Sequence, residues 1–234
     1  MPIQTFEKTD FYSKAKNWYA PLLGTVIDDD GYYFVADFLP VSGMKMVICD
    51  ISSPLSSFGH ADDIYFCTDW DSSTNKPTNK IQTVTGSLCR FNTNYFFKNN
   101  SGNIYGYLYN LTPEKLGDLG FNMLFNVGND WYLLTAVDGY PYHHLIKVSY
   151  PYETCSLIGL ALDVDYLSAN GKYYMAPVYL TKANQIISTV PNIYCITKKP
   201  AYTSHVVGDN YILFTPYAYN FEGLKSWLVI DLSS

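Results

Sequence analysis

The sequence predicts an all-β fold, and three observations lead to this prediction. Tyrosine and phenylalanine, which favour strands, occur 23 and 13 times among 234 residues. The 21 acidic residues comprise 17 aspartates and only 4 glutamates, a bias that suits turns because aspartate bonds to its own backbone. A unit in which a turn rich in Asp, Asn or Gly precedes an aromatic strand and a returning strand recurs about six times along the chain.

The aromatic strand is the clearest part of each unit. The first aromatic residue of this strand recurs every 30 to 42 residues. Period-two side-chain alternation and aromatic content are typical of strands bounded by turn residues. Six aromatic strands are therefore expected, at residues 31–34, 64–66, 94–97, 130–133, 172–175 and 210–213.

A returning strand follows most of these aromatic strands, and in several units an apolar run precedes the turn. Returning strands are expected at residues 44–51, 103–108, 143–148, 192–196 and 226–232, and the preceding apolar runs are residues 22–27, 121–127 and 157–162. Several strands, such as 131–134 and 228–230, are apolar at consecutive positions. Such strands are expected to be covered on both faces.

This repeat resembles the blade of a β-propeller, which has a period of about 40 residues and up to four strands. The resemblance implies a single all-β domain over residues 1–234 with five or six blades of three to four strands. The sequence lacks the WD, kelch and Asp-box signatures, so a β-sandwich or two small barrels are the alternatives. In a closed ring the last strand, 227–232, would pair with an N-terminal segment such as 18–27.

Helix is expected only in short pieces. Residues 1–20 are expected to form a short helical or extended N-terminal arm, with helix between residues 5 and 17. A second short helix is predicted at 113–116, where Thr112 is a suitable N-cap and Pro113 occupies the first helical position.

Composition and charge argue against several classes of protein. The formal net charge is −6, and Arg90 is the only arginine, which argues against a nucleic-acid binder because phosphate and base edges are read mainly by guanidinium groups. The N-terminal stretch has no apolar h-region, so no signal peptide is expected. The sequence contains no run of about 18 apolar residues, so no membrane insertion is expected. The cysteines lack metal-ligand spacing and are expected to be buried thiols rather than disulfides.

No motif in the sequence fixes a reaction, a cofactor or a metal. The GxSxG, GxxxxGK[ST] and GxGxxG patterns of acyl transfer and nucleotide binding are absent. His143 and His144 are adjacent in a predicted strand, so they cannot share one metal ion. The acidic groups at 28–30 and 62–71 lack the spacing of a calcium loop. We therefore expect no catalytic residue, no metal and no cofactor.

The candidate contact residues are aromatic side chains beside turns. Exposed rings next to Asp or Asn can stack on sugars or anchor a protein partner. The candidates are Trp70, Tyr140, Tyr142, Tyr150, Tyr152, Tyr217 and Tyr219. The alternative is that proline fixes each turn and the tyrosines only cover the ends of hairpins.

In its composition and predicted architecture the chain resembles virion proteins of tailed bacteriophages, especially tail, baseplate and fibre components. The resemblance implies a non-catalytic structural protein that binds other protein subunits of the particle or a host surface, and that is assembled in the host cytoplasm. One alternative is a carbohydrate-binding, lectin-like module that recognises a surface glycan. Another is a glycoside-active enzyme with an unrecognised pair of aspartates.

Overall fold

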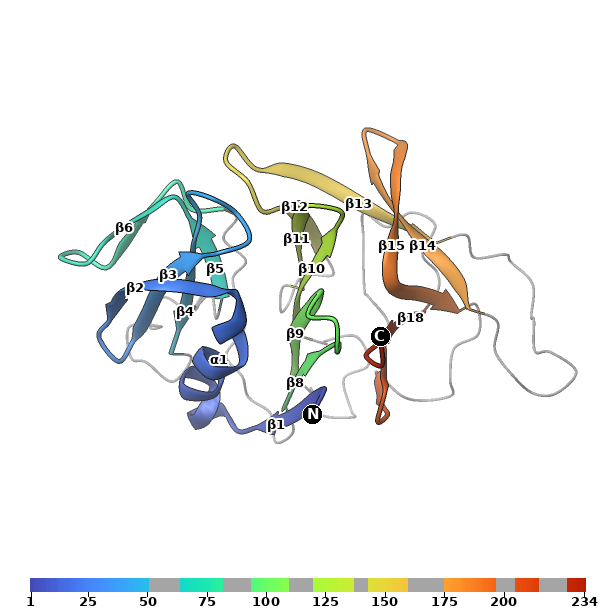
Figure 1. Ribbon diagram of the computed structural model, residues 1–234, viewed down its shortest axis with the longest axis horizontal. Coiled ribbons are helices and arrows are strands. Elements are labelled where there is room, and N and C mark those ends of the chain that lie inside the picture. The colour runs from blue at the N-terminus through green and yellow to red at the C-terminus, as the bar shows by residue number, and fades with distance from the viewer. Residues whose placement is uncertain are drawn as a thin grey trace, which may run out of the picture.

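The computed structural model describes residues 1–50, 64–81, 94–109, 120–136, 143–159, 175–196, 205–214 and 227–234 (Figure 1). These residues form an all-β structure with one α-helix, and their strands make two main antiparallel sheets. The predicted all-β class is therefore confirmed.

The smaller sheet is formed by the N-terminal part of the chain. Its order is β2-β3-β4-β5, and these strands are Leu23–Asp29, Tyr33–Phe38, Lys45–Cys49 and Ile64–Cys67. Two further strands, β6 (Asp69–Asp71) and β7 (Lys76–Thr78), form a separate hairpin. Tryptophan 70 of this hairpin packs with residues of β3, β4 and β5, so the hairpin covers one face of the smaller sheet.

The helix α1 (Phe11–Tyr19) covers the other face of the smaller sheet. It lies between two 3-10 turns, η1 (Lys8–Asp10) and η2 (Ala20–Leu22). Its buried residues are Phe11, Ala15, Trp18 and Tyr19, whose spacing places them on one side of a helix. The α-helix ends before Pro21, which has no N–H to continue the ladder. The N-terminal segment is thus part of the packed structure.

The larger sheet has twelve strands in the order β1-β8-β9-β10-β11-β12-β13-β14-β15-β18-β17-β16 and curls into a half-barrel (Figure 1). Every strand pairing in it is antiparallel, and most neighbouring strands follow one another along the chain. Its strands are Ile3–Phe6, Asn94–Lys98, Ile104–Tyr109, Gly120–Val127, Asp130–Ala136, His143–Lys147, Glu153–Gly159, Ala176–Lys182, Gln185–Ile196, Trp227–Asp231, Tyr211–Phe214 and His205–Val207, in the same order.

The described strands do not form a propeller of five or six blades. In a propeller each blade is a separate sheet. Here the strands of neighbouring repeat units pair along one continuous ladder, as β9 does with β10 and β12 with β13. The last strand, β18, pairs with β15 and β17 rather than with residues 18–27. Within the larger sheet, the described copies of the turn-and-strand unit thus join edge to edge, whereas the first units form the smaller sheet, and the strand expected at 172–175 lies, except for residue 175, outside the described residues.

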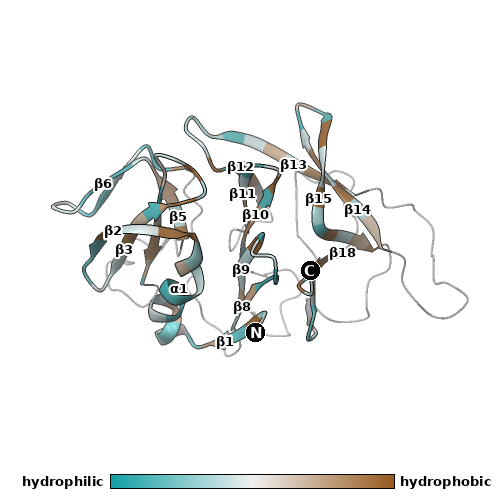
Figure 2. Ribbon diagram, in the orientation of Figure 1, coloured by the Kyte–Doolittle hydropathy of each residue, from teal (hydrophilic) through white to brown (hydrophobic). Residues whose placement is uncertain are grey.

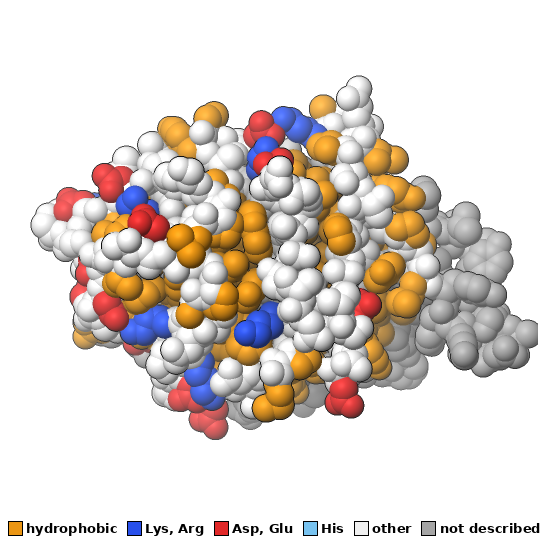
Figure 3. Space-filling model, in the orientation of Figure 1, with side chains coloured by type: hydrophobic (Ala, Val, Ile, Leu, Met, Phe, Trp, Pro, Cys, Tyr) orange, Lys and Arg blue, Asp and Glu red, His pale blue; other side chains and the backbone are white. Residues whose placement is uncertain are grey.

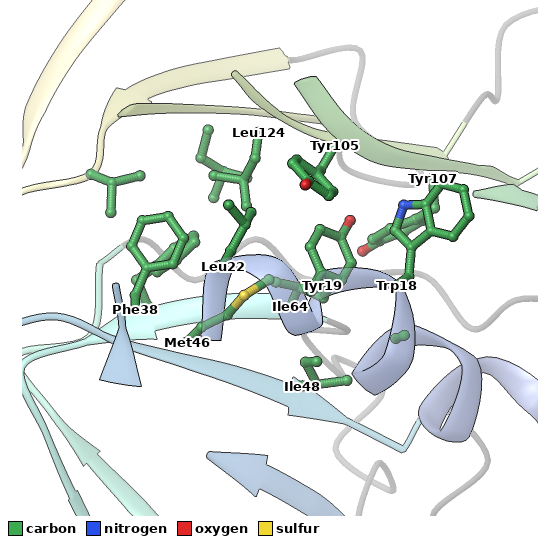
Figure 4. Close-up of a cluster of buried hydrophobic side chains, with 14 of the residues drawn as sticks. Trp18, Tyr19, Leu22, Phe38, Met46, Ile48, Ile64, Tyr105, Tyr107 and Leu124 are labelled. Carbon is green, nitrogen blue, oxygen red and sulfur yellow. The ribbon is translucent and has the colours of Figure 1, made fainter. Parts of the chain in front are cut away.

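Both faces of the larger sheet are covered over β8 to β12. On one face, side chains such as Tyr105 and Leu124 meet α1 and the smaller sheet (Figure 4). On the other face, Phe97, Met123 and Leu134 belong to a second core inside the curl, which also includes residues of β13, β14, β15, β17 and β18. The prediction that the doubly apolar strands are covered on both sides is confirmed.

The curl brings the end of β18 next to the turn between β8 and β9. The backbone N–H of Ser101 donates to the carbonyl oxygen of Ser234 at 2.9 Å, and the Asn100 side chain donates to the carbonyl oxygen of Ser233 at 3.1 Å. Leu232 is fully buried in the inner core. These contacts hold together two parts of the larger sheet that are far apart in sequence.

Candidate interaction surface

Trp70, the first of the predicted contact residues, lies in the core. Its side chain is only 6% exposed, and its ring lies 5.3 Å from the Tyr33 ring, centroid to centroid. The indole Nε1 donates a hydrogen bond to a carboxylate oxygen of Asp28 at 2.7 Å. Its strand neighbours Asp69 and Asp71 are exposed, as alternation along a strand requires. Trp70 therefore anchors the β6–β7 hairpin and presents no free ring face for a ligand.

Tyr150 and Tyr152 are the predicted contact residues that the structure places on the surface. They flank Pro151 in the turn between β12 and β13, and their exposed fractions are 55% and 48%. The other four predicted tyrosines, Tyr140, Tyr142, Tyr217 and Tyr219, lie outside the described residues.

The turn that carries Tyr150 and Tyr152 lies at the same end of the larger sheet as the β14–β15 turn. Consecutive strands of an antiparallel meander reverse direction, so alternate turns fall at one end. The β10–β11 turn lies there too. Two ion pairs at this end bridge strands, Lys147 to Asp130 at 2.8 Å and Lys182 to Glu153 at 2.7 Å. The hydrogen bond between the latter two raises the pKa of Lys182 and lowers that of Glu153.

Two isoleucines of β15, which were not among the predicted contact residues, extend this exposed apolar surface. Ile186 is 61% exposed and Ile187 is 51% exposed. In the register of β14 with β15, Thr181 pairs with Ile186 and Leu180 with Ser188, so Ile187 is an extra residue at a bulge. We call Tyr150, Tyr152, Ile186 and Ile187 the apolar end of the sheet.

The β14–β15 hairpin projects beyond the rest of the sheet (Figure 1). A hydrophobic stretch occupies one limb near its tip (Figure 2), and hydrophobic side chains are visible on its surface (Figure 3). The turn at the tip uses Ala183 and Asn184, both with positive φ. At its base β15 bends at residues 190–193, where the register with β14 shifts and Asn192 has a φ of 63°.

The sequence does mark the hairpin tip, by a lack of charged residues. The ten residues 183–192 contain no acidic or basic side chain. Four of the five residues at 186–190, before Pro191, are β-branched, which is typical of a strand, and the charges that usually protect an exposed edge are absent from this segment. This segment has no aromatic residue, so a search for aromatic residues beside turns does not identify it.

The acidic residues of the smaller sheet are used to shape turns. The Asp30 carboxylate accepts hydrogen bonds from the backbone N–H groups of Tyr32 and Tyr33 at 2.8 and 2.7 Å. The Asp29 carboxylate accepts hydrogen bonds from the Tyr12 hydroxyl and from the Lys16 ammonium. Partial burial raises the pKa of Asp29, but these two partners outweigh it and hold the pKa below its usual value. Within the described ranges, no group of three or more His, Cys, Asp or Glu side chains is arranged to hold a metal ion.

Several titratable groups lie on the face of the smaller sheet that the β6–β7 hairpin covers. Burial raises the pKa of the Cys67 thiol to about 11. The Lys80 ammonium lies 4.0 Å from the centroid of the Tyr65 ring, and burial lowers its pKa to about 8. Cys49, Cys67, Cys155 and Cys195 are buried free thiols, as expected for these four positions, and Cys89 lies outside the described residues.

No protein-family model, curated protein or solved structure matches this chain. None of the helices among the described residues has the length and apolar character needed to cross a membrane.

Proposed function

We propose that the protein is a non-catalytic subunit of a multi-protein particle, and that it contacts other subunits through the apolar end of its larger sheet. The observation that supports this proposal is the exposure of four large apolar side chains at one end of the sheet, two of them on a projecting hairpin. Single exposed apolar residues are common on protein surfaces, whereas several at one end of a sheet are typical of a contact site.

The composition of this end also supports a contact with protein. Tyrosine is enriched at protein interfaces because its ring gives a large contact area and its hydroxyl remains a hydrogen-bonding group. The charged residues nearby, Lys147, Lys182, Asp130 and Glu153, are paired with one another. A partner that covers the isoleucines therefore need not bury an unpaired charge from this end, which would be costly.

The proposed particle is a virion of the tailed-bacteriophage type. This part of the proposal rests on the resemblance in composition and on the all-β architecture, which suit a subunit with broad β surfaces. The partners would be neighbouring virion proteins or a host surface, and assembly would take place in the host cytoplasm.

Carbohydrate binding is a weaker second candidate. Of its predicted anchors, Trp70 is buried and its N–H is bonded to Asp28, which leaves Tyr150 and Tyr152 as exposed rings in the described part of the chain. Two tyrosines that flank a proline offer stacking surface. A glycan-array signal that disappears when both tyrosines are changed to serine is the result that would favour this function.

The proposal is tested by measuring whether the chain enters virus particles. Particles purified by density gradient from cells that produce the chain should contain it at a fixed copy number, measured by quantitative mass spectrometry. The double variants Y150S/Y152S and I186T/I187T should lower this occupancy about tenfold or more, because exposed anchors at a contact are worth more than 1 kcal/mol each. Both variants should keep wild-type stability to within about 0.5 kcal/mol.

The matched control is V26T/Y32S, which alters two exposed apolar residues of the smaller sheet, 54% and 41% exposed. This variant should enter particles like the wild type. Absence of the chain from purified particles, or equal occupancy of all three variants, would contradict the proposed function.

A further inference from the structure

We infer that the free edge of β15 at residues 185–190 pairs, antiparallel, with the same segment of a second copy of this chain. This inference deepens the proposed function and rests on it, since it names the first partner of the apolar end. Two sheets joined by strand addition share main-chain hydrogen bonds across the new edge.

The edge exists because β15 is longer than one of its neighbours. Residues Gln185 to Thr189 pair with β14 on one side. On the other side β15 pairs with β18 only at Ile193 to Ile196. In the described part of the chain, residues 185–190 therefore have one row of backbone groups with no strand beside it.

The free segment has a defined length. It begins after the Ala183-Asn184 turn and ends at Pro191, which has no N–H to donate to a ladder. The bend of β15 at residues 190–193 turns the hairpin away from β18. Six residues remain, which is an ordinary length for a strand.

A second copy suits this edge because the segment is neutral and β-branched. Two chains that each have a net charge of −6 repel one another, and like charges within the contact would add to this repulsion. Residues 183–192 have no charged side chain, so two copies can pair here without adding like charges at the contact. Antiparallel pairing about a two-fold axis at Ser188 would set Ile187 against Thr189 and Ile186 against Val190 of the other copy.

The side chains of this segment are already positioned for such a contact. Gln185, Ile186, Ile187 and Thr189 are exposed, whereas Val190 is buried in the inner core. Pairing would remove the two isoleucines from water, which is favourable in proportion to the apolar area covered. It would also pair the free backbone groups, which otherwise form a template for indiscriminate association.

The test is a charge-swap experiment on the full chain by sedimentation velocity at micromolar concentration. The wild type should sediment as a dimer. I187K and I187E should each weaken self-association about tenfold or more, because like charges then lie diagonally across the two-fold axis on the same face of the sheet. A 1:1 mixture of I187K with I187E should recover the dimer, since opposite charges then meet. V26K and V26E, at an exposed site on the smaller sheet, should sediment like the wild type.

The mixture keeps the inference falsifiable, because recovery of the dimer requires both variants to be folded. A wild-type chain that is monomeric at every concentration, an I187K variant that remains dimeric, or a mixture that stays monomeric would overturn the inference. A monomeric wild type that still enters virus particles overturns the self-pairing alone and points to a different chain as the occupant of the edge. A dimeric chain that is absent from particles overturns the proposed function and leaves the self-pairing intact.

Discussion

At the scale of single residues, Trp70 joins the β6–β7 hairpin to the smaller sheet. Its indole ring packs in a small core with Val35, Val47 and Tyr65, and its N–H reaches the Asp28 carboxylate, 42 residues earlier in the chain. The tryptophan therefore combines apolar burial with one charge-assisted hydrogen bond. Both terms are expected to appear in the free energy of unfolding.

Two substitutions separate these terms. W70F keeps most of the ring and removes the hydrogen bond, and it should lower the free energy of unfolding by about 1–3 kcal/mol. W70A also empties the space and should lower it by about 3–5 kcal/mol. Urea denaturation followed by circular dichroism measures both changes. If W70A left stability unchanged and abolished binding of a glycan, the assignment of Trp70 to the core would be wrong.

Lys80 is the described lysine whose titration is most altered by its surroundings. Burial next to the Tyr65 ring lowers its pKa from 10.5 to about 8, while the nearby Cys49 opposes the shift. Between these two values the unfolded chain binds more protons at this site than the folded chain. The contribution of Lys80 to the free energy of unfolding therefore rises with pH across this interval.

K80M provides the comparison, because methionine keeps apolar contact with the ring and does not titrate. The wild type should gain about 1 kcal/mol of stability relative to K80M between pH 7.5 and 9.5, after allowance for solvent screening of the partly exposed amine. Below about pH 7, one unit under the folded-state pKa, the difference should be nearly constant. The measurement is urea denaturation of both proteins at each pH, and a flat difference across this range would show that Lys80 is not the group responsible.

At the scale of elements, Gly106 lets β9 lie close to its neighbours in the larger sheet. It pairs with Phe97 of β8 and with Met123 of β10. A Cβ atom at this position would overlap the Phe97 ring, and it would lie 2.5 Å from the carbonyl oxygen of Asn122. The Phe97 side chain thus fills the place that a side chain at position 106 would take.

G106A should accordingly destabilise the protein by about 1–3 kcal/mol, since a backbone oxygen cannot move aside as a side chain can. The matched control is G24A in β2, where the nearest atom to a new Cβ belongs to the exposed Leu39 side chain, at 2.9 Å. G24A should change stability by less than about 0.5 kcal/mol. Equal losses for the two variants in thermal unfolding would contradict the close approach of β9 to β10.

The strands themselves were predictable from the sequence, because their signal is local. Aromatic strands expected at 94–97, 130–133 and 210–213 correspond to β8, β11 and β17, and the returning strands at 103–108 and 143–148 to β9 and β12. The pairing between units was not predictable. Whether β9 pairs with β10 of the next unit or closes a separate blade depends on contacts remote in sequence, such as those of the two cores.

The candidate surface was predictable only in part, for a related reason. The exposure of Tyr150 and Tyr152 was predictable because a proline between two tyrosines indicates a turn, and this signal does not depend on how the neighbouring strands pair. Trp70 was misjudged because a tripeptide of acid, tryptophan and acid fits an exposed loop as well as a strand with one buried position. Ile186 and Ile187 become conspicuous only once β18 is seen to stop short of them.

At the scale of the whole molecule, the larger sheet has one face against the smaller sheet and helix α1 and the other face inside its own curl. The curl is held where the β8–β9 turn meets residues 232–234. Asn99 organises this turn, because its buried side chain accepts hydrogen bonds from the backbone of Asn103 and Ile104 at 2.9 and 3.0 Å. The two cores thus fix the sheet, and the β14–β15 hairpin extends from it.

The central claim is that this projecting end is covered by other subunits in the assembled particle. Hydroxyl-radical footprinting with mass spectrometry, on the purified chain and on intact particles, tests it most directly. Oxidation of Tyr150, Tyr152, Ile186 and Ile187 should fall strongly in particles, whereas Tyr32, in the β2–β3 turn of the smaller sheet, should be oxidised equally in both samples. Equal oxidation of the apolar end in the two samples, or protection of Tyr32 alone, would show that other subunits do not cover this end.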